Sequence, residues 1–396
     1  MVWIGGSLNC NPKLALSHVW DFCFRNTTGF CYNSRMSKTA KNGANNGAEN
    51  AHENVALYTK YRPKKFSEVL GQEHVTAVLR DSLKNGNISH AYLFAGSRGT
   101  GKTSVARILA AEIETSNNDL FEIDAASNNG VDEIRALNES VNTLPFNSNY
   151  KVYILDEVHM LSKSAFNALL KTLEEPPRHV IFVLATTELE KIPETVISRC
   201  EVYNFKTPNR ETLKQMVAST AKAEGYTLGE GVAELVSIIG DGSFRDTHTI
   251  LQKLIRSSAD KNLDLKEVEK VTGAPKSKMI NDCVQAVATG DVDLVFAVTK
   301  NISESNIDVK VFMRLFLEKF RAGIVLRIAP NKAGDLEGSF SSDDLGFLKK
   351  LVAEHVEVFN AGNLLRLLEA FDLLGRSSMP VLAFELVLVE IISKKS

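Results

Sequence analysis

Apolar and polar positions follow two different patterns along the chain, and the change falls near residue 207. Before it, short apolar runs bounded by glycine or polar residues predict buried strands, with helix-like periodic segments between them. Strands that alternate with helices are typical of βαβ units and a parallel sheet. The predicted strands are residues 90–95, 120–123, 151–155 and 180–186, and the predicted helices include 131–141 and 164–175.

After residue 207 only helical spacing remains. Residues 209–273 predict a small helical unit, in which Asp241-Gly-Ser243 supplies capping residues for a helix that starts near Phe244. Residues 275–396 also predict helices, and the last of these is apolar nearly all round, as expected of a helix buried in its own domain or against a neighbouring subunit. Two apolar stripes occur in this part, Phe312, Phe316, Phe320, Ile324 and Ile328 in one and Leu364, Leu367, Leu368, Phe371 and Leu374 in the other.

The predicted parts are therefore an α/β core at 55–207, a helical domain at 208–275 and an all-α domain at 276–396. We expect residues 1–54 to be disordered, or to include sequence translated from an early start, because 37–54 is polar and buries too little surface to fold. A zinc site formed by Cys10, Cys23, Cys31 and His18 is the less favoured alternative, since the spacing matches no paired C-x-x-C motif.

The length, charge and cysteine content of the chain exclude several classes of protein. At about 150 residues per domain, the 396 residues predict two or three domains. A formal net charge of −2 excludes a protein that coats nucleic acid by bulk positive charge. No window approaches 18 apolar residues and no signal-peptide pattern opens the chain, so we expect no membrane span and no secretion. Five cysteines are typical of a reducing compartment, which predicts a cytoplasmic protein.

A glycine-rich segment directly after the first predicted strand carries the clearest chemistry. It fits G-x-x-x-x-G-K-[ST] and precedes a helix, so its backbone N–H groups and the positive helix end would surround phosphate oxygens. Lys102 would reach the β- and γ-phosphates and Thr103 would bind Mg²⁺. A purely structural turn is the alternative. The predicted nucleotide-binding residues are Gly96, Ser97, Arg98, Gly99, Thr100, Gly101, Lys102 and Thr103.

A second motif, Val152-Tyr-Ile-Leu-Asp-Glu157, places two carboxylates at the end of a buried strand. Ligands bind at this edge of open parallel sheets. Asp156 would hold Mg²⁺ and Glu157 would orient the attacking water. A solvated acidic strand end is the alternative, and the presence of the phosphate loop in the same chain makes it less favoured.

Three more polar residues complete the predicted site. Thr187 ends the next strand and would hydrogen-bond the water or the γ-phosphate. Arg199 lies in a loop, and Arg245 lies in the first turn of a helix, where a cation opposes the helix dipole and favours an anionic partner. For either arginine alone, a surface salt bridge is the more common arrangement.

These segments together resemble the AAA+ clamp-loader family. The resemblance runs from about Val55 to the C-terminus, and it is dense to residue 275. The segments are Tyr61-Arg-Pro to Val69-Leu-Gly-Gln72, His90-Ala-Tyr-Leu-Phe94, Ile123-Asp-Ala-Ala-Ser127, Asp156-Glu-Val-His-Met-Leu161, Phe166-Asn-Ala-Leu-Leu-Lys-Thr-Leu-Glu-Glu-Pro-Pro177, Leu184-Ala-Thr-Thr187, Ser198-Arg-Cys200 and Arg245-Asp246.

The resemblance implies a P-loop ATPase core with helices on both faces of its sheet, a helical lid at 208–275 and a collar at 276–396. It implies that Thr187 senses the γ-phosphate, that Arg245 contacts phosphate in its own subunit, and that Arg199 is an arginine finger for the neighbouring subunit. ATP and Mg²⁺ are the implied cofactors. The implied partners are the other subunits of a pentameric, hetero-oligomeric ring, a sliding clamp and primer–template DNA.

Two departures from the family change the expectations. Residues 115–119 run directly into the second predicted strand, where the family carries four zinc-binding cysteines, so we expect no zinc there. The extra domains of the family's long form have no counterpart before Ser396, so the chain is similar to the short form.

Other functions stay open from the sequence. A non-hydrolysing ring scaffold would lack Lys102 or Thr103, and a branch-migration helicase would carry a winged-helix domain with strands at its C-terminus. No catalytic carboxylates of a polymerase appear. Arg135 is either a DNA-phosphate contact or an ordinary exposed arginine.

Overall fold

The computed structural model describes residues 55–305, 307–331, 334, 340, 342–374 and 377–394. The expectations for residues 1–54, including the alternative zinc site, lie outside this part. Among the described residues, no helix has the length and apolar character needed to cross a membrane.

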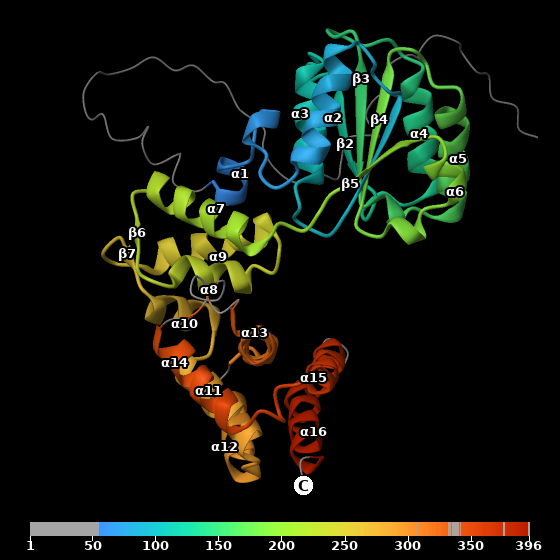
Figure 1. Cartoon of the computed structure of the whole chain (residues 1–396). Helices are drawn as coiled ribbons and strands as arrows, with labels where there is room; N and C mark the ends of the chain where they lie inside the picture. Colours follow the sequence, from blue (N-terminus) through green and yellow to red (C-terminus); the bar gives the residue numbers. More distant parts are fainter. Residues whose placement is uncertain are drawn as a thin grey trace, which may run out of the picture. The chain divides into compact units, whose positions relative to one another are not determined.

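A five-stranded parallel sheet forms the centre of the first part, in the order β2-β3-β4-β1-β5 (Figure 1). Its strands are β1 (Ala91–Ala95), β2 (Leu120–Asp124), β3 (Lys151–Asp156), β4 (Val180–Thr186) and β5 (Glu201–Asn204). The four strands predicted from sequence are confirmed. The fifth, β5, was not predicted, because it is a short edge strand with a single buried residue and so has no apolar run.

Helices cover both faces of this sheet. On one face lie α2 (Glu73–Lys84) and α3 (Lys102–Glu112), and on the other α4 (Val131–Val141), α5 (Lys163–Glu174) and α6 (Glu194–Ile197) (Figure 1). Side chains that alternate along each strand enter two separate cores. In β1, Tyr92 and Phe94 pack in the α2–α3 core, whereas Leu93 packs in the α4–α5 core. The order of elements and the two covered faces confirm the predicted AAA+ α/β fold.

The second part contains α7 (Arg210–Ala223), α8 (Val232–Ile239), α9 (Phe244–Ser257) and α10 (Leu265–Thr272), and the short α1 (Leu57–Lys60) packs into their core. The prediction of helices alone was wrong here. The two-residue strands β6 (Thr227–Leu228) and β7 (Asn262–Leu263) pair in parallel, and strands this short leave no apolar pattern. The predicted cap is confirmed, since Ser243 Oγ accepts a hydrogen bond from the Asp246 amide at the start of α9.

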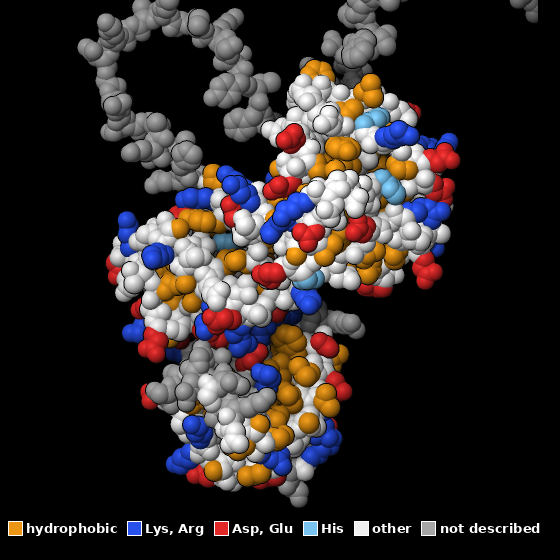
Figure 2. All heavy atoms as spheres, turned by 45° about the horizontal axis from the view of Figure 1, so that its top comes forward, with side chains coloured by type: hydrophobic (Ala, Val, Ile, Leu, Met, Phe, Trp, Pro, Cys, Tyr) orange, Lys and Arg blue, Asp and Glu red, His pale blue; other side chains and the backbone are white. Residues whose placement is uncertain are grey.

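The C-terminal part consists of helices in the described residues: α11 (Ser277–Thr289), α12 (Val292–Glu304), α13 (Val309–Ile328), α14 (Ser342–Glu354), α15 (Ala361–Leu374) and α16 (Pro380–Ser393). The stripe on α13 is buried at Phe312, Phe316 and Phe320, but Ile328 is 68% exposed. Helix α16 is buried on one side only, since Leu386 is 62% exposed. Figure 2 shows hydrophobic side chains gathered on the surface of these helices.

Candidate functional site

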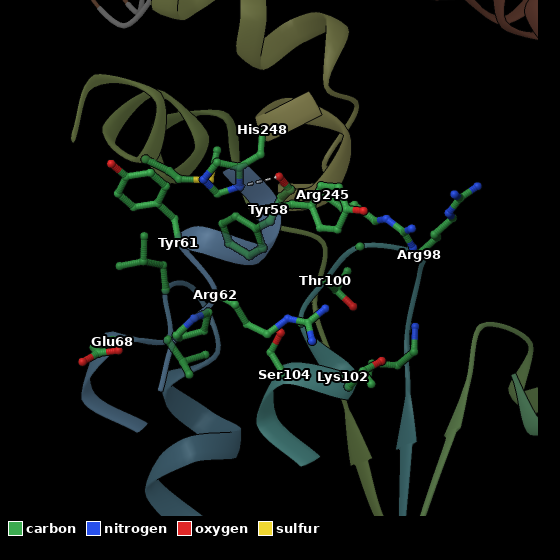
Figure 3. A pocket seen from close by; sticks show the side chains of 18 of the residues that line it. Tyr58, Tyr61, Arg62, Glu68, Arg98, Thr100, Lys102, Ser104, Arg245 and His248 are labelled. Atoms are coloured by element: carbon green, nitrogen blue, oxygen red, sulfur yellow. Dashed lines mark hydrogen bonds between the residues drawn. The ribbon is translucent and has the colours of Figure 1, made fainter. Parts of the chain in front are cut away.

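One pocket collects residues from three places in the chain: the segment around α1, the glycine-rich loop with the end of β3, and helices α7 and α9 (Figure 3). The loop between β1 and α3 lines its floor. Its lining includes Tyr58, Tyr61, Arg62, Arg98, Gly99, Thr100, Gly101, Lys102, Thr103, Asp156, Glu157, Met216, Phe244, Arg245 and His248.

The glycine-rich loop has the backbone shape that its sequence predicts. Gly99 and Gly101 have φ values of 75° and 104°, in the left-handed region that other residues rarely adopt. A Cβ atom at Gly99 would collide with Ser243, and the Phe244 amide donates a hydrogen bond of 3.0 Å to the Gly99 carbonyl oxygen. The loop therefore touches the start of α9 directly.

Lys102 is the first residue of α3 and is almost fully buried. Its Nζ donates to the carbonyl oxygens of Gly96 and Ser97, at 2.8 and 3.0 Å. Burial lowers the pKa of this ammonium group, while the nearby charges of Glu157 and Asp156 act in the opposite direction. The cation points at the loop it would use to hold phosphate.

Thr103 and Asp156 meet across the gap between α3 and β3. The Thr103 hydroxyl donates to Asp156 Oδ2 at 2.8 Å, and Asp156 Oδ1 accepts from the Glu157 amide at 3.0 Å. A hydroxyl and a carboxylate oxygen are ligands that Mg²⁺ prefers. The pair that the sequence predicts as metal ligands is brought together.

Glu157 follows directly and has φ of 50°, a strained conformation for a residue other than glycine. Such outliers persist where the surroundings hold them and cluster at functional sites. The Thr187 hydroxyl, just after β4, donates to Glu157 Oε2 at 3.0 Å. The structure thus joins two predicted residues that lie 30 positions apart.

Four cationic side chains surround the loop. Besides Lys102, these are Arg98, Arg245 and Arg62, and Figure 3 shows them around one space. The Arg245 guanidinium stands 5.1 Å from the centre of the Tyr58 ring. The pKa of Arg62 is lowered by burial and by the nearby Arg107, which is typical of a cation placed among other cations. Sequence analysis did not single out Arg62, although it lies in a segment noted for the family resemblance.

The opposite end of the pocket is aromatic. The rings of Tyr61 and His248 lie 6.2 Å apart and nearly parallel. His248 Nδ1 lies 3.0 Å from the Phe244 carbonyl oxygen, which can only accept, so this nitrogen carries the proton. Burial lowers the pKa of His248 and favours the neutral ring. A flat, neutral surface of this kind suits a planar ring system. His248 and Met216 were missed because their spacing on α9 and α7 looks like ordinary core.

Comparison with known proteins gives the family. Residues 71–129 and 113–209 match the family model described as "DNA polymerase III, delta subunit". DNA polymerase III subunit gamma of Buchnera aphidicola is 34% identical over 296 residues, which cover 69% of this chain and 80% of the relative. This chain belongs to the DNA polymerase III gamma/tau family. Subunit gamma/tau of Mycobacterium tuberculosis is 39% identical over 302 residues, covering 70% of this chain and 52% of the relative.

The chain spans about half the length of the first curated gamma/tau relatives that it matches. Among solved structures, the RuvB Holliday junction branch migration motor of Thermotoga maritima is 18% identical and covers 61% of this chain and 85% of its own, with a TM-score of 0.46. At that TM-score the similarity adds nothing to the assignment, which rests on the gamma/tau relatives.

Gly96, Ser97, Thr187 and Arg199 are predicted site residues that do not line the pocket, although the first three contact Lys102 or Glu157. Arg199 lies between α6 and β5, where its guanidinium pairs with Glu174 at 2.6 Å and donates to the Thr195 carbonyl oxygen at 2.6 Å. The structure does not bring Arg199 to the loop of its own chain, so its predicted action on a neighbour stays a prediction. Arg135 is exposed and pairs with Asp132 at 3.1 Å, which leaves both interpretations of it open.

Proposed function

We propose that this gamma/tau-family chain binds and hydrolyses ATP with Mg²⁺ and uses that energy, in a ring with other clamp-loader subunits, to load a sliding clamp on primer–template DNA. One observation carries the proposal. A single pocket contains the glycine-rich loop, Lys102, the Thr103–Asp156 pair and Glu157. These are the parts that phosphoanhydride hydrolysis needs.

The phosphate-binding step uses groups that already face the pocket. Phosphate oxygens would replace the carbonyl oxygens of Gly96 and Ser97 as acceptors of the Lys102 ammonium group. Thr103 and Asp156 would hold Mg²⁺, which neutralises charge on the β- and γ-phosphates. Residues 96–101 would donate backbone N–H groups, and the positive end of α3 favours an anion there.

The hydrolytic step falls to Glu157 and Thr187. The Glu157 carboxylate would orient the attacking water and accept its proton. Thr187, whose hydroxyl donates to that carboxylate, would contact the water or the terminal phosphate. Arg245 would reach phosphate from α9, and Arg199 would complete the site of a neighbouring subunit.

Base recognition falls to the aromatic end of the pocket. Tyr61, Met216 and His248 would enclose the adenine ring by stacking and apolar contact. Because α9 carries both His248 and Arg245 and touches Gly99 through the Phe244 amide, a bound nucleotide would join the lid to the core.

Two surfaces support the proposed partners. Leu144 and Phe146, at 79% and 80%, are the most exposed large apolar side chains among the described residues, and they share one loop after α4. We assign this loop to the clamp. The exposed face of α15 and α16, with Leu365 and Leu386 at 60% and 62%, is assigned to neighbouring ring subunits.

A non-hydrolysing scaffold is disfavoured because Lys102 and Thr103, one or other of which such scaffolds lack, are present in the glycine-rich segment. The test is Lys102→Ala, with the exposed Lys84→Ala as a matched control. We expect Lys102→Ala to abolish ATP turnover and clamp loading on primed DNA while its circular dichroism spectrum stays unchanged, and Lys84→Ala to behave as the wild type. Normal turnover by Lys102→Ala would overturn the proposal.

A further inference from the structure

His159 is a polar side chain beside Glu157 to which the proposed hydrolysis gives no task. It lies in a one-turn 3₁₀ helix, Val158–Met160, and is two residues after Glu157. Its side chain is only 6% exposed, whereas the Glu157 side chain is 31% exposed. The ring is therefore a fixed, buried group against a partly open carboxylate.

The two ring nitrogens of His159 contact different side chains. Nδ1 lies 3.1 Å from Thr186 Oγ1 and 3.5 Å from Glu157 Oε2. Nε2 lies 3.2 Å from Glu188 Oε1, and Lys191 pairs with the same carboxylate at 2.8 Å. Glu188 also donates its amide to Thr186 Oγ1 at 3.0 Å. The ring is thus anchored on both sides at the end of β4.

Glu157 Oε2 has two polar neighbours from this region, and they differ in what they are free to do. The Thr187 hydroxyl donates to Oε2 at 3.0 Å, but the proposed function requires that hydroxyl to turn to the water or the terminal phosphate. When it does, Glu157 loses a donor. His159 has no such second task, because its buried ring is held by Thr186 and Glu188.

We propose that His159 is a positioning residue that holds the Glu157 carboxylate in place while Thr187 engages the nucleotide. This inference rests on the proposed hydrolytic role of Glu157. It also accounts for the strained backbone of Glu157, since a conformation with φ of 50° needs support from its surroundings. Residues 186, 187 and 188 each contact either Glu157 or the ring that supports it, so the end of β4 is coupled to the carboxylate.

Two conservative variants separate this role from simple packing. His159→Asn keeps a polar group at the place of Nδ1, facing Glu157, whereas His159→Gln keeps one at the place of Nε2, facing Glu188. A carboxylate displaced by about 1 Å costs on the order of a hundredfold in rate. We expect His159→Ala and His159→Gln to lower kcat about a hundredfold with KM for ATP within about twofold, and His159→Asn to recover about tenfold of the loss.

A structural readout accompanies the kinetics. In crystal structures of the variants, we expect the Glu157 carboxylate to leave the Thr187 hydroxyl in His159→Ala and to keep that contact in His159→Asn. Recovery by Gln but not Asn, or an unmoved carboxylate in His159→Ala, would overturn the proposal. If His159→Ala does not fold, the Asn and Gln variants alone decide the matter.

A double-variant cycle tests whether His159 acts through Glu157. With Glu157→Gln as the starting point, adding His159→Ala should reduce single-turnover hydrolysis by less than about twofold, because the carboxylate it would position is gone. A full additional hundredfold loss would show that the ring acts elsewhere. Absence of ATP turnover in the wild-type chain would instead contradict the proposed function. The crystal structures of the variants would still show whether His159 determines the position of the Glu157 carboxylate.

Discussion

Strand β3 begins with a buried charge, Lys151, where the parallel strands start, which we call the amino edge of the sheet. It ends with another charge, Asp156, where the strands end, which we call the carboxyl edge. The two charges have different kinds of hydrogen-bond partner. At the amino edge, Lys151 Nζ donates to the Ser140 carbonyl oxygen at 2.9 Å and to Thr143 Oγ1 at 2.6 Å. At the carboxyl edge, Asp156 accepts a hydrogen bond from the side chain of Thr103. The first set of partners caps the end of α4, and the second belongs to the pocket.

The amino edge is closed by contacts to backbone. Asp119, just before β2, is fully buried and accepts hydrogen bonds from the amides of Phe146 and Asn147 at 2.5 and 2.8 Å and from Ser116 at 2.9 Å. His179 adds contacts to the carbonyl oxygens of residues 141 and 143. Burial alone would raise the pKa of Asp119, but these donors outweigh it and hold the pKa well below its usual range.

The carboxyl edge is held by side chains, two of which donate to other side chains and one to backbone carbonyl oxygens. Thr187 donates to Glu157, Thr103 donates to Asp156, and Lys102 donates to the loop that it would leave for a phosphate. Such partners can be exchanged when a ligand arrives, whereas an amide held in a loop cannot leave. Substitutions at the carboxyl edge should therefore change rates, and substitutions at the amino edge should change stability and the presentation of the 143–147 loop.

Arg199 is the exception to this comparison. It lies just before β5, whose first residue pairs with Tyr92 at the amino edge, and so it belongs to that edge. Its proposed role nevertheless predicts an effect on the rate of hydrolysis. An arginine finger is worth about 10³–10⁵ in turnover. We expect Arg199→Ala to lower turnover by this order while ATP affinity in its own subunit stays nearly unchanged. Phosphate release and binding of a fluorescent ATP analogue measure the two effects.

Mixing decides whether Arg199 acts across an interface. Lys102→Ala subunits keep a working arginine and Arg199→Ala subunits keep a working pocket, so mixed rings should regain hydrolysis. Glu174→Gln is the matched control, because it removes the negative charge that pairs with Arg199 within the chain and spares the guanidinium. No recovery in rings shown to be mixed would leave Arg199 as a structural arginine.

Glu157→Gln gives the sharpest test of the carboxyl edge. The amide keeps an oxygen that accepts from Thr187 but cannot take a proton from water, so turnover should fall by about 10²–10⁴. ATP affinity and the melting temperature should stay as in the wild type. The exposed Glu190→Gln serves as control. A wild-type rate in Glu157→Gln would remove the proposed role of this carboxylate.

The two edges also differ in what the sequence reveals. The phosphate loop and Asp156-Glu157 were predicted because local geometry fixes their spacing: glycines at positive φ before a helix, and carboxylates after a buried strand. Asp119 binds amides 27 and 28 positions away, so no short pattern marks it. His159 and His248 were missed for a different reason, since single polar residues on buried faces have the spacing of ordinary core residues.

Substitutions in the loop of residues 143–147 at the amino edge should weaken binding of the clamp without lowering ATP turnover. Leu144 and Phe146 are exposed on a loop whose ends are fixed by Lys151 and Asp119. Because the loop is already ordered, binding of a partner would cost little conformational entropy. Replacing both by serine should weaken clamp binding about a hundredfold, at roughly 1.5 kcal/mol per apolar side chain. ATP turnover without the clamp should not change. Surface plasmon resonance with immobilised clamp measures this, and unaltered affinity would move the clamp contact elsewhere.

Asp119→Asn is expected to have the smallest effect and to leave turnover untouched. The two carboxylate oxygens accept from different donors, Oδ1 from Phe146 and Oδ2 from Asn147 and Ser116. An Asn side chain keeps one acceptor oxygen and its NH2 group cannot accept, so at least one buried donor loses its partner, which costs about 1.5 kcal/mol of unfolding free energy at pH 7. Because the folded pKa of Asp119 is depressed, this stabilisation is present above the unfolded pKa of about 3.9 and is lost as the pH falls toward the folded value. Urea unfolding followed by circular dichroism should therefore show the same gap between variant and wild type at pH 7 and pH 5, and a smaller one near pH 3. The exposed Asp132→Asn, matched in chemistry, should show a gap below about 0.5 kcal/mol at each of these pH values, because Asp132 has one exposed ion pair in the first turn of α4. Hydrogen exchange should show faster amides at Phe146 and Asn147 in Asp119→Asn, and a gap that persists unchanged at low pH would mean that the carboxylate charge does not stabilise this edge.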